Sequence, residues 1–457
     1  MRLTKQKRLS GQKGLIGAFV RSAGYERRFL AKNPWDLSMV LWIPLATVLL
    51  IWWIFSQIQI TDLPIGVMDK DRGPIANTAV RYLEANPNLT VRQLYHSPAA
   101  VEAALLQRDI YAVVIIPEDF SRNISSSKPA PIVLQVNAQY GTHSGIIQTS
   151  VQSVIGTLSA GVEIQRLVKQ GMAPSQAAIA YSPIGIQRIS LFNAATDYQQ
   201  FLASTVIPAL LHILAMVIGA TTIGRELRDK QIGRWYDFIE SGHPDLTNIE
   251  TNIETNIETN IKNDIENHKT IAASTSAADN KTSVIDSKPR KASISVLLSG
   301  LLGKYFWPTL AYSLWSILAL WLATPQQAVA ISSLMATYVG LVLLMMLSFW
   351  LGAIFTLTSF SLRMGLSSTG FISAPSYAFA GVTFPYIAIS DSAKHWSDAL
   401  PLTHYLKLHI AQLQMQAPVA ISLPIVYGLT LATVIAMFLA ALLSKRALAH
   451  PERWGAR

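Results

Sequence analysis

The chain has 457 residues, of which 51% are hydrophobic and only 14% are charged, whereas an average soluble domain has about 25% charged residues. Its formal net charge is +10, but the basic residues lie between and beside apolar segments, so this charge is not evidence for a nucleic-acid partner. The absence of cysteine excludes disulfides, cysteine-based metal sites and a thiol nucleophile.

Six apolar segments are long enough to cross a bilayer, whose core of about 30 Å needs roughly 20 helical residues. Because about 35 residues precede the first segment, we expect it to remain as an anchor and not to be cleaved as a signal peptide. Basic residues gather before the first segment and after the last, so the positive-inside rule predicts that both termini are cytoplasmic. The segments cover residues 37–56, 201–223, 305–323, 328–350, 364–382 and 423–443.

The predicted fold is therefore an α-helical integral membrane protein with six transmembrane helices and an inserted α/β extracytoplasmic domain. Its expected parts, in chain order, are a cytoplasmic basic amphipathic segment (1–36), transmembrane helix 1 (37–57), the extracytoplasmic domain (58–200), transmembrane helix 2 (201–223), a cytoplasmic turn and helix (224–244), a low-complexity flexible cytoplasmic insertion (245–293), transmembrane helices 3–6 with an outer hairpin at 383–417 (294–444), and a cytoplasmic tail (445–457).

The stretch between the first two apolar segments alternates short β-type runs with helical patterns, which is typical of a compact α/β domain. Strands are predicted at 64–68, 89–94, 111–116 and 131–136, and helices at 75–84, 99–106, 118–124 and 144–170.

Two carboxylates, Asp69 and Asp71, follow the first predicted strand. A pair at this spacing can bind a hard cation or act in acid–base chemistry, which is all that a membrane-enzyme hypothesis would rest on. The sequence around them, with Gly73 and Pro74, is more typical of a turn that caps the next helix. We favour the structural interpretation.

A loose group of titratable residues precedes the last apolar segment: His395, His404, His409, Asp391 and Asp398. The histidine spacings of nine and five residues place no pair one helical turn apart, so a metal site is not favoured.

His212 lies inside the second apolar segment, where an ionisable residue is a candidate for the transport pathway. A neutral histidine that bonds to a neighbouring helix is the alternative. The nearest approach to a phosphate loop, residues 300–305, lacks the required spacing and the Ser or Thr that would hold magnesium. The sequence therefore contains no recognisable nucleotide site, and Lys304 is expected at the inner membrane interface.

Two further blocks are distinctive. A dense charged turn follows the second apolar segment and could present its charges to a cytosolic partner. After the fifth segment, a glycine and a Phe-Pro break precede an apolar stretch too short to span, which suggests a re-entrant or interfacial hairpin at the outer face. The charged block contains Arg225, Glu226, Arg228, Asp229, Lys230 and Gly233, and the outer block contains Gly381, Phe384 and Pro385.

This order of elements resembles the permease subunits of ABC-2 type exporters, in the subgroup with a large extracytoplasmic domain between the first two transmembrane helices. The resemblance covers nearly the whole chain. The chain departs from the family pattern at Arg234, where the family has Thr, and at Gly242-His-Pro244, where it has Thr-Pro. The matching motifs are Leu191-Phe192-Asn193, Gly224-Arg225-Glu226, Gly303-Lys304, Ala380-Gly381, Phe384-Pro385 and Pro401-Leu402-Thr403.

The resemblance implies a pore-forming subunit of the bacterial inner membrane that exports a hydrophobic or amphipathic substrate with a separate ABC ATPase. It implies no cofactor in this chain, because ATP and Mg²⁺ would sit on the ATPase subunit. Other implied partners are a second copy or a paralogous permease, membrane lipid and a periplasmic adaptor, but no nucleic acid. The charged block would couple to the ATPase, the outer block would form a gate, and His212 would lie on the pathway. A non-transport scaffold or receptor with an extracytoplasmic ligand-binding domain is the alternative.

Overall fold

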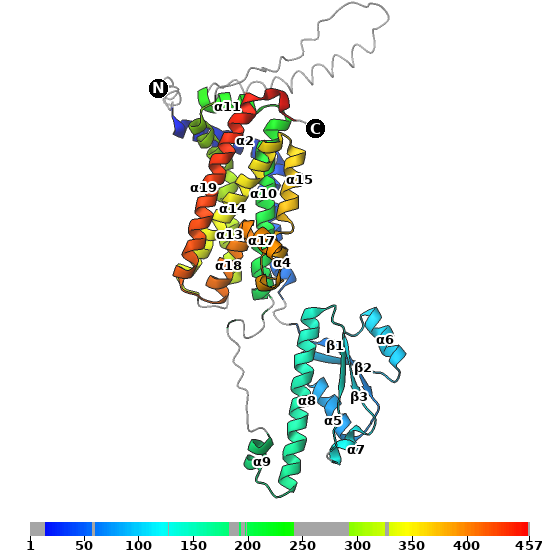
Figure 1. Ribbon diagram of the computed structural model, residues 1–457. Helices are drawn as coiled ribbons and strands as arrows, with labels where there is room; N and C mark the ends of the chain where they lie inside the picture. The colour runs from blue at the N-terminus through cyan, green and yellow to red at the C-terminus, as the bar shows by residue number, and fades with distance from the viewer. Residues whose placement is uncertain are drawn as a thin grey trace, which may run out of the picture. The chain divides into compact units, whose positions relative to one another are not determined.

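The computed structural model describes residues 14–56, 60–126, 128–181, 192, 197, 199–241, 292–324 and 329–455. These residues form two compact units (Figure 1). Unit 1 combines Met1–Ser56 with Gln199–Arg457, and unit 2 is Gln57–Tyr198. The predicted low-complexity insertion at 245–293 lies, except for its last two residues, outside the described part of the chain.

Unit 2 is built on a four-stranded sheet with the strand order β2-β1-β3-β4. β1 runs parallel to β2 and β3, whereas β4 is antiparallel to β3. One face packs against α5, α7 and the long α8, and α6 covers the other. The bounds are β1 Leu63–Asp69, α5 Pro74–Glu84, β2 Leu89–Leu94, α6 Pro98–Gln107, β3 Ala112–Ile116, α7 Phe120–Ser125, β4 Val133–Val136, α8 Gly141–Lys169 and α9 Pro174–Tyr181.

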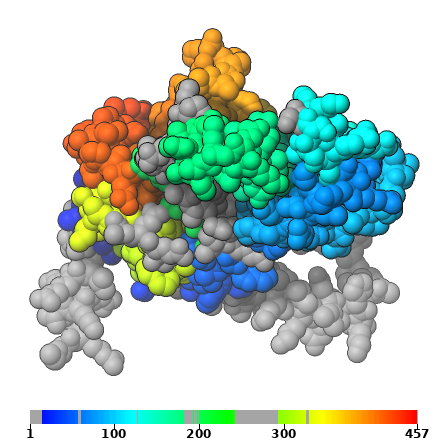
Figure 2. Space-filling view, turned by 90° about the horizontal axis from the view of Figure 1, so that it is seen from below, coloured from blue at the N-terminus to red at the C-terminus, as the bar shows by residue number. Residues whose placement is uncertain are grey.

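Every strand and helix predicted in this stretch is present, with bounds displaced by at most a few residues. The short apolar runs form the buried strands because their residues fill the core between the sheet and the helices, as Ile65, Val67 and Val114 do. α9, which was not predicted, packs against α8. Seen from below, α9 and the adjoining end of α8 form one green patch (Figure 2).

Unit 1 is a helical bundle in which α14 packs against α10, α13, α15 and α19. Among the described residues, four helices are long and apolar enough to cross a membrane, or five if the bent pair α3 and α4, with an angle of 41°, counts as one span. The bounds are α2 Leu15–Lys32, α3 Pro34–Val40, α4 Trp42–Ile54, α10 Ser204–Arg228, α11 Ile232–Ser241, α13 Ile294–Ala323, α14 Ile331–Ser359, α15 Leu362–Ser373, α16 Ser376–Phe379, α17 Asp391–Ala399, α18 Pro401–His409 and α19 Val419–Ala449.

The prediction of one continuous apolar helix over 364–382 is wrong. α15 ends at Ser373, and the four-residue α16 begins only after Pro375. A proline lacks the amide proton that a helix needs. The chain therefore breaks at Ala374 and Pro375, and α15 alone is only 12 residues long.

Close contact between α10 and α14 depends on two glycines. A Cβ atom on Gly219 would lie 2.1 Å from Phe349 O, and one on Gly352 would lie 2.1 Å from Met216 O. The backbones can approach only because both residues lack a side chain.

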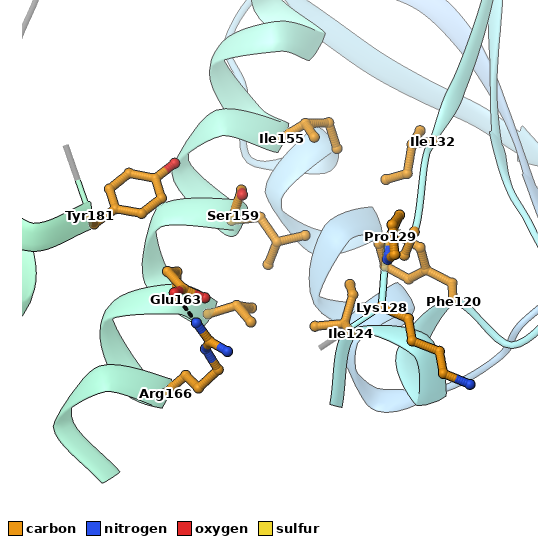
Figure 3. A pocket seen from close by; sticks show the side chains of 13 residues that line it. Phe120, Ile124, Lys128, Pro129, Ile132, Ile155, Ser159, Glu163, Arg166 and Tyr181 are labelled. Atoms are coloured by element: carbon orange, nitrogen blue, oxygen red, sulfur yellow. Dashed lines mark hydrogen bonds and ion pairs between the residues drawn. The ribbon is translucent and has the colours of Figure 1, made fainter. Parts of the chain in front are cut away.

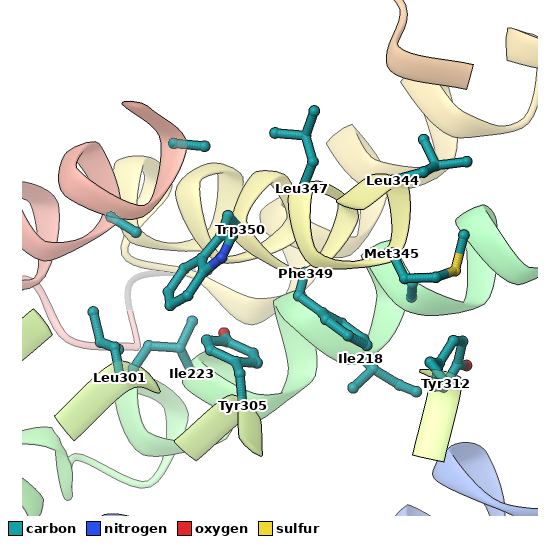
Figure 4. Close-up of a cluster of buried hydrophobic side chains, with 14 of the residues drawn as sticks. Ile218, Ile223, Leu301, Tyr305, Tyr312, Leu344, Met345, Leu347, Phe349 and Trp350 are labelled. Carbon is teal, nitrogen blue, oxygen red and sulfur yellow. The ribbon is translucent and has the colours of Figure 1, made fainter. Parts of the chain in front are cut away.

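Aromatic residues of α13 and α14 fill the space beside this crossing (Figure 4). The Tyr305 ring centroid lies 5.0 Å from that of Trp350, and the Tyr312 centroid lies 5.4 Å from that of Phe349. Such edge-to-face pairs add to the stabilisation from burial.

Candidate functional site

Four charged side chains are buried together where α2, α10 and α13 meet, and we call them the buried charge cluster. They are Glu26, Arg225, Glu226 and Lys304, each at most 6% exposed. The Lys304 Nζ atom lies 2.7 Å from Glu226 Oε1 and 3.5 Å from Glu26 Oε2. Arg225 donates a hydrogen bond to Glu26. Two acids and two bases therefore balance one another, as buried charges must.

Aromatic rings enclose the two cations of the cluster. The Arg225 guanidinium carbon lies 3.7 Å from the centroid of the Phe29 ring. Lys304 Nζ lies 4.8 Å from the Tyr25 centroid and 5.2 Å from that of Trp235. The negative face of an aromatic ring attracts a cation, most strongly where water is excluded. Because Trp235 belongs to α11, the cluster joins this helix to the bundle as well.

The local sequence explains how the cluster forms. Ser22 and Glu26 lie one turn apart on the buried face of α2. On α13, Gly303 allows α2 to come close, because a Cβ atom there would lie 2.3 Å from Phe19 O. Its neighbour Lys304 is thereby brought within reach of Glu26.

The pairing within the cluster is incomplete. Among the described residues, neither Glu26 Oε1 nor Arg225 Nε has a hydrogen-bond partner. Buried ion pairs contribute little net stability relative to well-packed apolar residues, but removing one partner costs about 3–5 kcal/mol because the other charge stays buried and unpaired. The cluster thus penalises any arrangement of α2, α10 and α13 in which the charges move apart.

Three residues of the predicted coupling block are not on the surface of this chain. Arg225 and Glu226 lie inside the bundle, and Gly233 is buried at the start of α11. In this structure these three residues therefore do not face a cytosolic partner directly. The physical reason is that α10 continues as a helix to Arg228 and is covered by α2 and α13, which supply the opposite charges.

The remaining charged residues of the block are exposed and form, with Arg234, what we call the α11 charged surface. Arg228 and Asp229 form an ion pair of 2.8 Å at the end of α10. Lys230 then adopts a φ of +56°, which turns the chain into α11. On the opposite side of α11, Trp235, with Tyr236 and Ile239, is buried. The helix is thus apolar toward the bundle and charged outward.

The predicted outer block lies between α16 and α17. Gly381 has a φ of +79°, a conformation that glycine adopts without strain. Phe384 is 53% exposed, and Pro385 precedes a single 3₁₀ turn, Tyr386–Ala388. The Tyr386 hydroxyl donates a hydrogen bond of 2.8 Å to Asp398 on α17, which closes this loop.

The three histidines of this region have separate partners. His395 contacts the carbonyl oxygen of Asp391, and His404 contacts that of Asp398, at 2.6 and 2.8 Å. His409 is buried beside the hydroxyl of Tyr405. Among the described residues, no group of three or more His, Cys, Asp or Glu side chains could hold a metal ion.

His212 is buried between α10 and α14, where its Nδ1 atom lies 2.6 Å from Ser348 Oγ. The Ser348 hydroxyl donates to Leu344 O, so it accepts its second hydrogen bond from His212. His212 thus bonds to a neighbouring helix, α14.

The carboxylates of Asp69 and Asp71 accept hydrogen bonds from other groups of the chain. Asp69 Oδ1 accepts hydrogen bonds from the amides of Asp71 and Arg72, both at 3.0 Å. Asp71 Oδ2 accepts from the amides of Gly73 and Ser121, both at 3.1 Å, and from the Ser121 hydroxyl. These bonds form the turn that was favoured from the sequence. The cap on α5, however, comes from Ser121 Oγ, which lies 3.4 Å from the Ala76 amide, and not directly from a carboxylate.

Sequence reasoning missed Glu26 and assigned Lys304 to the membrane interface. A signal for Glu26 was available, since it is an acid in a strongly basic segment and lies four residues after Ser22 on one helical face. For Lys304 no local pattern could reveal a partner, because Glu226 lies 78 residues away in the chain.

Residues 34–236 match a family model described as "ABC-2 family transporter protein". The chain is also similar to the crystal structure of "a domain of a putative ABC type-2 transporter from Thermotoga maritima MSB8", at 19% identity and a TM-score of 0.21. That likeness covers 27% of this chain and 81% of the solved one. No protein of curated function matches. Over residues 34–236, which are less than half of its length, the chain is thus similar to the ABC-2 transporter family.

Proposed function

We propose that this protein is the permease subunit of an ABC-2 type exporter and forms the membrane pathway for ATP-driven efflux. The observation that carries the proposal is the α11 charged surface, in which Arg228 and Lys230 just before α11 and Arg234 on it are exposed, while α11 itself is tied to three bundle helices through the buried charge cluster. A force on such a helix reaches α2, α10 and α13 through contacts that resist separation.

The proposed topology has six spans in a bacterial inner membrane, with both termini in the cytoplasm. α3 with α4, then α10, α13, α14 and α19 supply five, and α15 with α16 would supply a broken sixth. Within unit 1, α11, α2 and the end of α19 lie at one end, and α17 and α18 lie at the other (Figure 1). This separation fits a cytoplasmic coupling end and an outer end. Unit 2 would then be extracytoplasmic.

The proposed coupling runs from a separate ATPase subunit, which would hold ATP and Mg²⁺, to the α11 charged surface. Arg228, Asp229 and Lys230 would touch the ATPase. Arg225, Glu226 and Gly233 would act indirectly, by transmitting the movement of α11 into the bundle.

At the outer end, the loop containing Gly381, Phe384 and Pro385 would open for release. Its exposed apolar side chain suits a segment that moves, and the hydrogen bond from Tyr386 to Asp398 would hold it in the closed position. His212 would stay a structural link beside the pathway.

A hydrophobic or amphipathic substrate is proposed from a cavity of about 430 Å³ between α14, α18 and α19. Leu347, Ile425 and Leu429 line its apolar side, and Asp398 and His404 line the other. A second copy or a paralogous permease would complete the pore, with membrane lipid around it and a periplasmic adaptor as a further partner.

The test is co-purification of the tagged chain with candidate ABC ATPase subunits. We expect the double variant Lys230→Glu, Arg234→Glu to lose the ATPase while it keeps the thermal stability of the wild type. The matched control is Lys445→Glu, Arg446→Glu, which places the same charge change on exposed residues near the end of α19. Equal binding by both variants would refute the assigned surface, and no association with any ATPase would favour a scaffold or receptor.

A further inference from the structure

Unit 2 contains a cavity of about 500 Å³ between α8 on one side and α7 with the chain leading to β4 on the other (Figure 3). Ligand pockets commonly have volumes of about 300–1,000 Å³. α9 borders the opening, and Figure 3 shows Tyr181 reaching from it toward Ser159. The apolar wall consists of Phe120, Ile124, Ile132, Ile155, Leu158 and Val162.

Most of this wall belongs to the core of the unit. Phe120 and Leu158 are buried in it, and Ile132, Ile155 and Val162 pack against it while keeping part of their surface open to the cavity. The wall is therefore held in place by the fold and does not need a ligand to form. A pre-formed apolar wall lowers the entropic cost of binding.

Among the described residues that line the cavity, the charged ones lie at its rim (Figure 3). Glu163 and Arg166 form an ion pair with each other along α8. Lys128 is exposed, and among the described residues no carboxylate lies within ion-pair distance of its ammonium. The described rim residues thus carry a net charge of +1 beside an apolar interior, and the positive charge that these neighbours do not balance is that of Lys128.

We propose that this cavity binds a single-chain amphiphile with one anionic head group, with the chain against the apolar wall and the head group at Lys128. The volume admits one alkyl chain of fatty-acid length, and the charge selects an anion over a cation or a neutral head group. The inference goes beyond the proposed transport function, because the site lies wholly within unit 2 and its occupancy can be measured without an ATPase.

The absence of cysteine allows a direct occupancy assay on the full chain in phosphatidylcholine nanodiscs. A Ser159→Cys variant places the only thiol of the chain at the cavity, and a Thr157→Cys variant places it on the exposed face of α8, outside the cavity. The two positions lie about 200° apart around the helix. The measurement is the rate of maleimide labelling with dodecanoate, dodecylamine or dodecanol.

We expect dodecanoate to slow labelling several-fold in the Ser159→Cys variant and to leave the Thr157→Cys variant unchanged. Dodecylamine should protect much less than dodecanoate. Adding Lys128→Gln to the Ser159→Cys variant should reduce protection by dodecanoate to that given by dodecanol, since the head group loses its counter-charge.

Three results would overturn the proposal. Equal slowing at both positions would mean a general effect of the amphiphile on the membrane. No slowing at Ser159→Cys would mean an unoccupied cavity, and equal protection by the amine and the carboxylate would remove the anionic selectivity. None of these results depends on transport, so a failure of the permease proposal would not be mistaken for a failure of this one.

Discussion

Lys304 on α13 and Glu226 on α10 form a fully enclosed ion pair, with Nζ and Oε1 2.7 Å apart and neither side chain more than 3% exposed. The same ammonium also lies 3.5 Å from Glu26 on α2. One side chain therefore links three helices that are far apart in the sequence. Its removal should affect the bundle more than the loss of any exposed charge.

We predict that Lys304→Met destabilises the protein by about 3–5 kcal/mol, because it leaves two carboxylates buried with one cation. The measurement is the melting temperature of the purified protein in detergent, followed by size-exclusion chromatography of heated samples. The double variant Glu226→Gln, Lys304→Met, which removes one charge of each sign, should melt higher than Lys304→Met. If the melting temperature of the double variant falls by the sum of the decreases caused by the two single substitutions, Glu226 and Lys304 are not coupled.

The glycine crossing of α10 and α14 gives a second prediction. Gly219→Ala and Gly352→Ala should each destabilise unit 1 by about 1–3 kcal/mol, because the added Cβ collides with backbone atoms that cannot move aside. Gly370→Ala on α15 is the matched control, since no atom lies within 4 Å of its Cβ position. The measurement is the thermal unfolding of the three variants. Equal melting temperatures would contradict the close approach of the α10 and α14 backbones.

A third prediction concerns the turn of unit 2. Asp71→Ala should cost about 1–3 kcal/mol, because the amides of Gly73 and Ser121 would lose their acceptor. Asp119→Asn is the control, since asparagine also tolerates the positive φ of this residue and the change removes only the charge of an exposed ion pair with Arg122, which is worth about 0–1 kcal/mol.

The readout is proteolysis of unit 2 under mild denaturation, which should be faster for Asp71→Ala alone. If Asp71→Ala leaves proteolysis and folding intact but abolishes an activity of the protein, the carboxylate has a chemical role and the structural interpretation fails.

The loop of the outer block should depend on pH. The hydrogen bond from Tyr386, helped by Lys407 and His404, lowers the pKa of Asp398. A carboxylate with a lowered pKa stabilises the folded form above its unfolded pKa of about 3.9 and loses this effect as the pH falls through its folded pKa. We therefore expect the loop to be closed at neutral pH and to loosen below about pH 4.

Amide hydrogen exchange over 386–399, corrected for the intrinsic pH dependence, measures this loosening. In a Tyr386→Phe variant the loop should exchange faster already at neutral pH and change less on acidification. The same pH profile in variant and wild type would show that the Tyr386 bond does not close the loop.

Local patterns were sufficient for much of the architecture. The alternation of apolar runs and helical stretches between residues 58 and 200 predicted the strands and helices of unit 2, since burial of a strand face and a helix face leaves a periodic trace. The turn at Asp69 and Asp71 was predicted as well, because its bonds to the amides of Asp71, Arg72 and Gly73 are local, whereas the bonds from Ser121 join residues 50 positions apart. Hydropathy likewise indicated the helices α10, α13, α14 and α19.

The prediction from hydropathy was wrong where a single proline interrupts a long apolar stretch. Residues 364–382 are apolar enough to suggest a span, but Pro375 interrupts the helical hydrogen bonds, so α15 and α16 are separate. Average hydrophobicity carries no information about a single missing amide proton.

The sequence by itself thus determined that the chain is a helical membrane protein with a small α/β unit, because those properties depend on residues near one another in the chain. Only the tertiary structure decided the environment of Arg225 and Glu226, which looked like a surface turn and are buried. Their burial requires opposite charges from Glu26 and Lys304, which lie 199 and 78 residues away from their partners. A charge can be buried in a helical bundle only where a distant helix supplies an opposite charge. A local sequence pattern contains no information about such a contact.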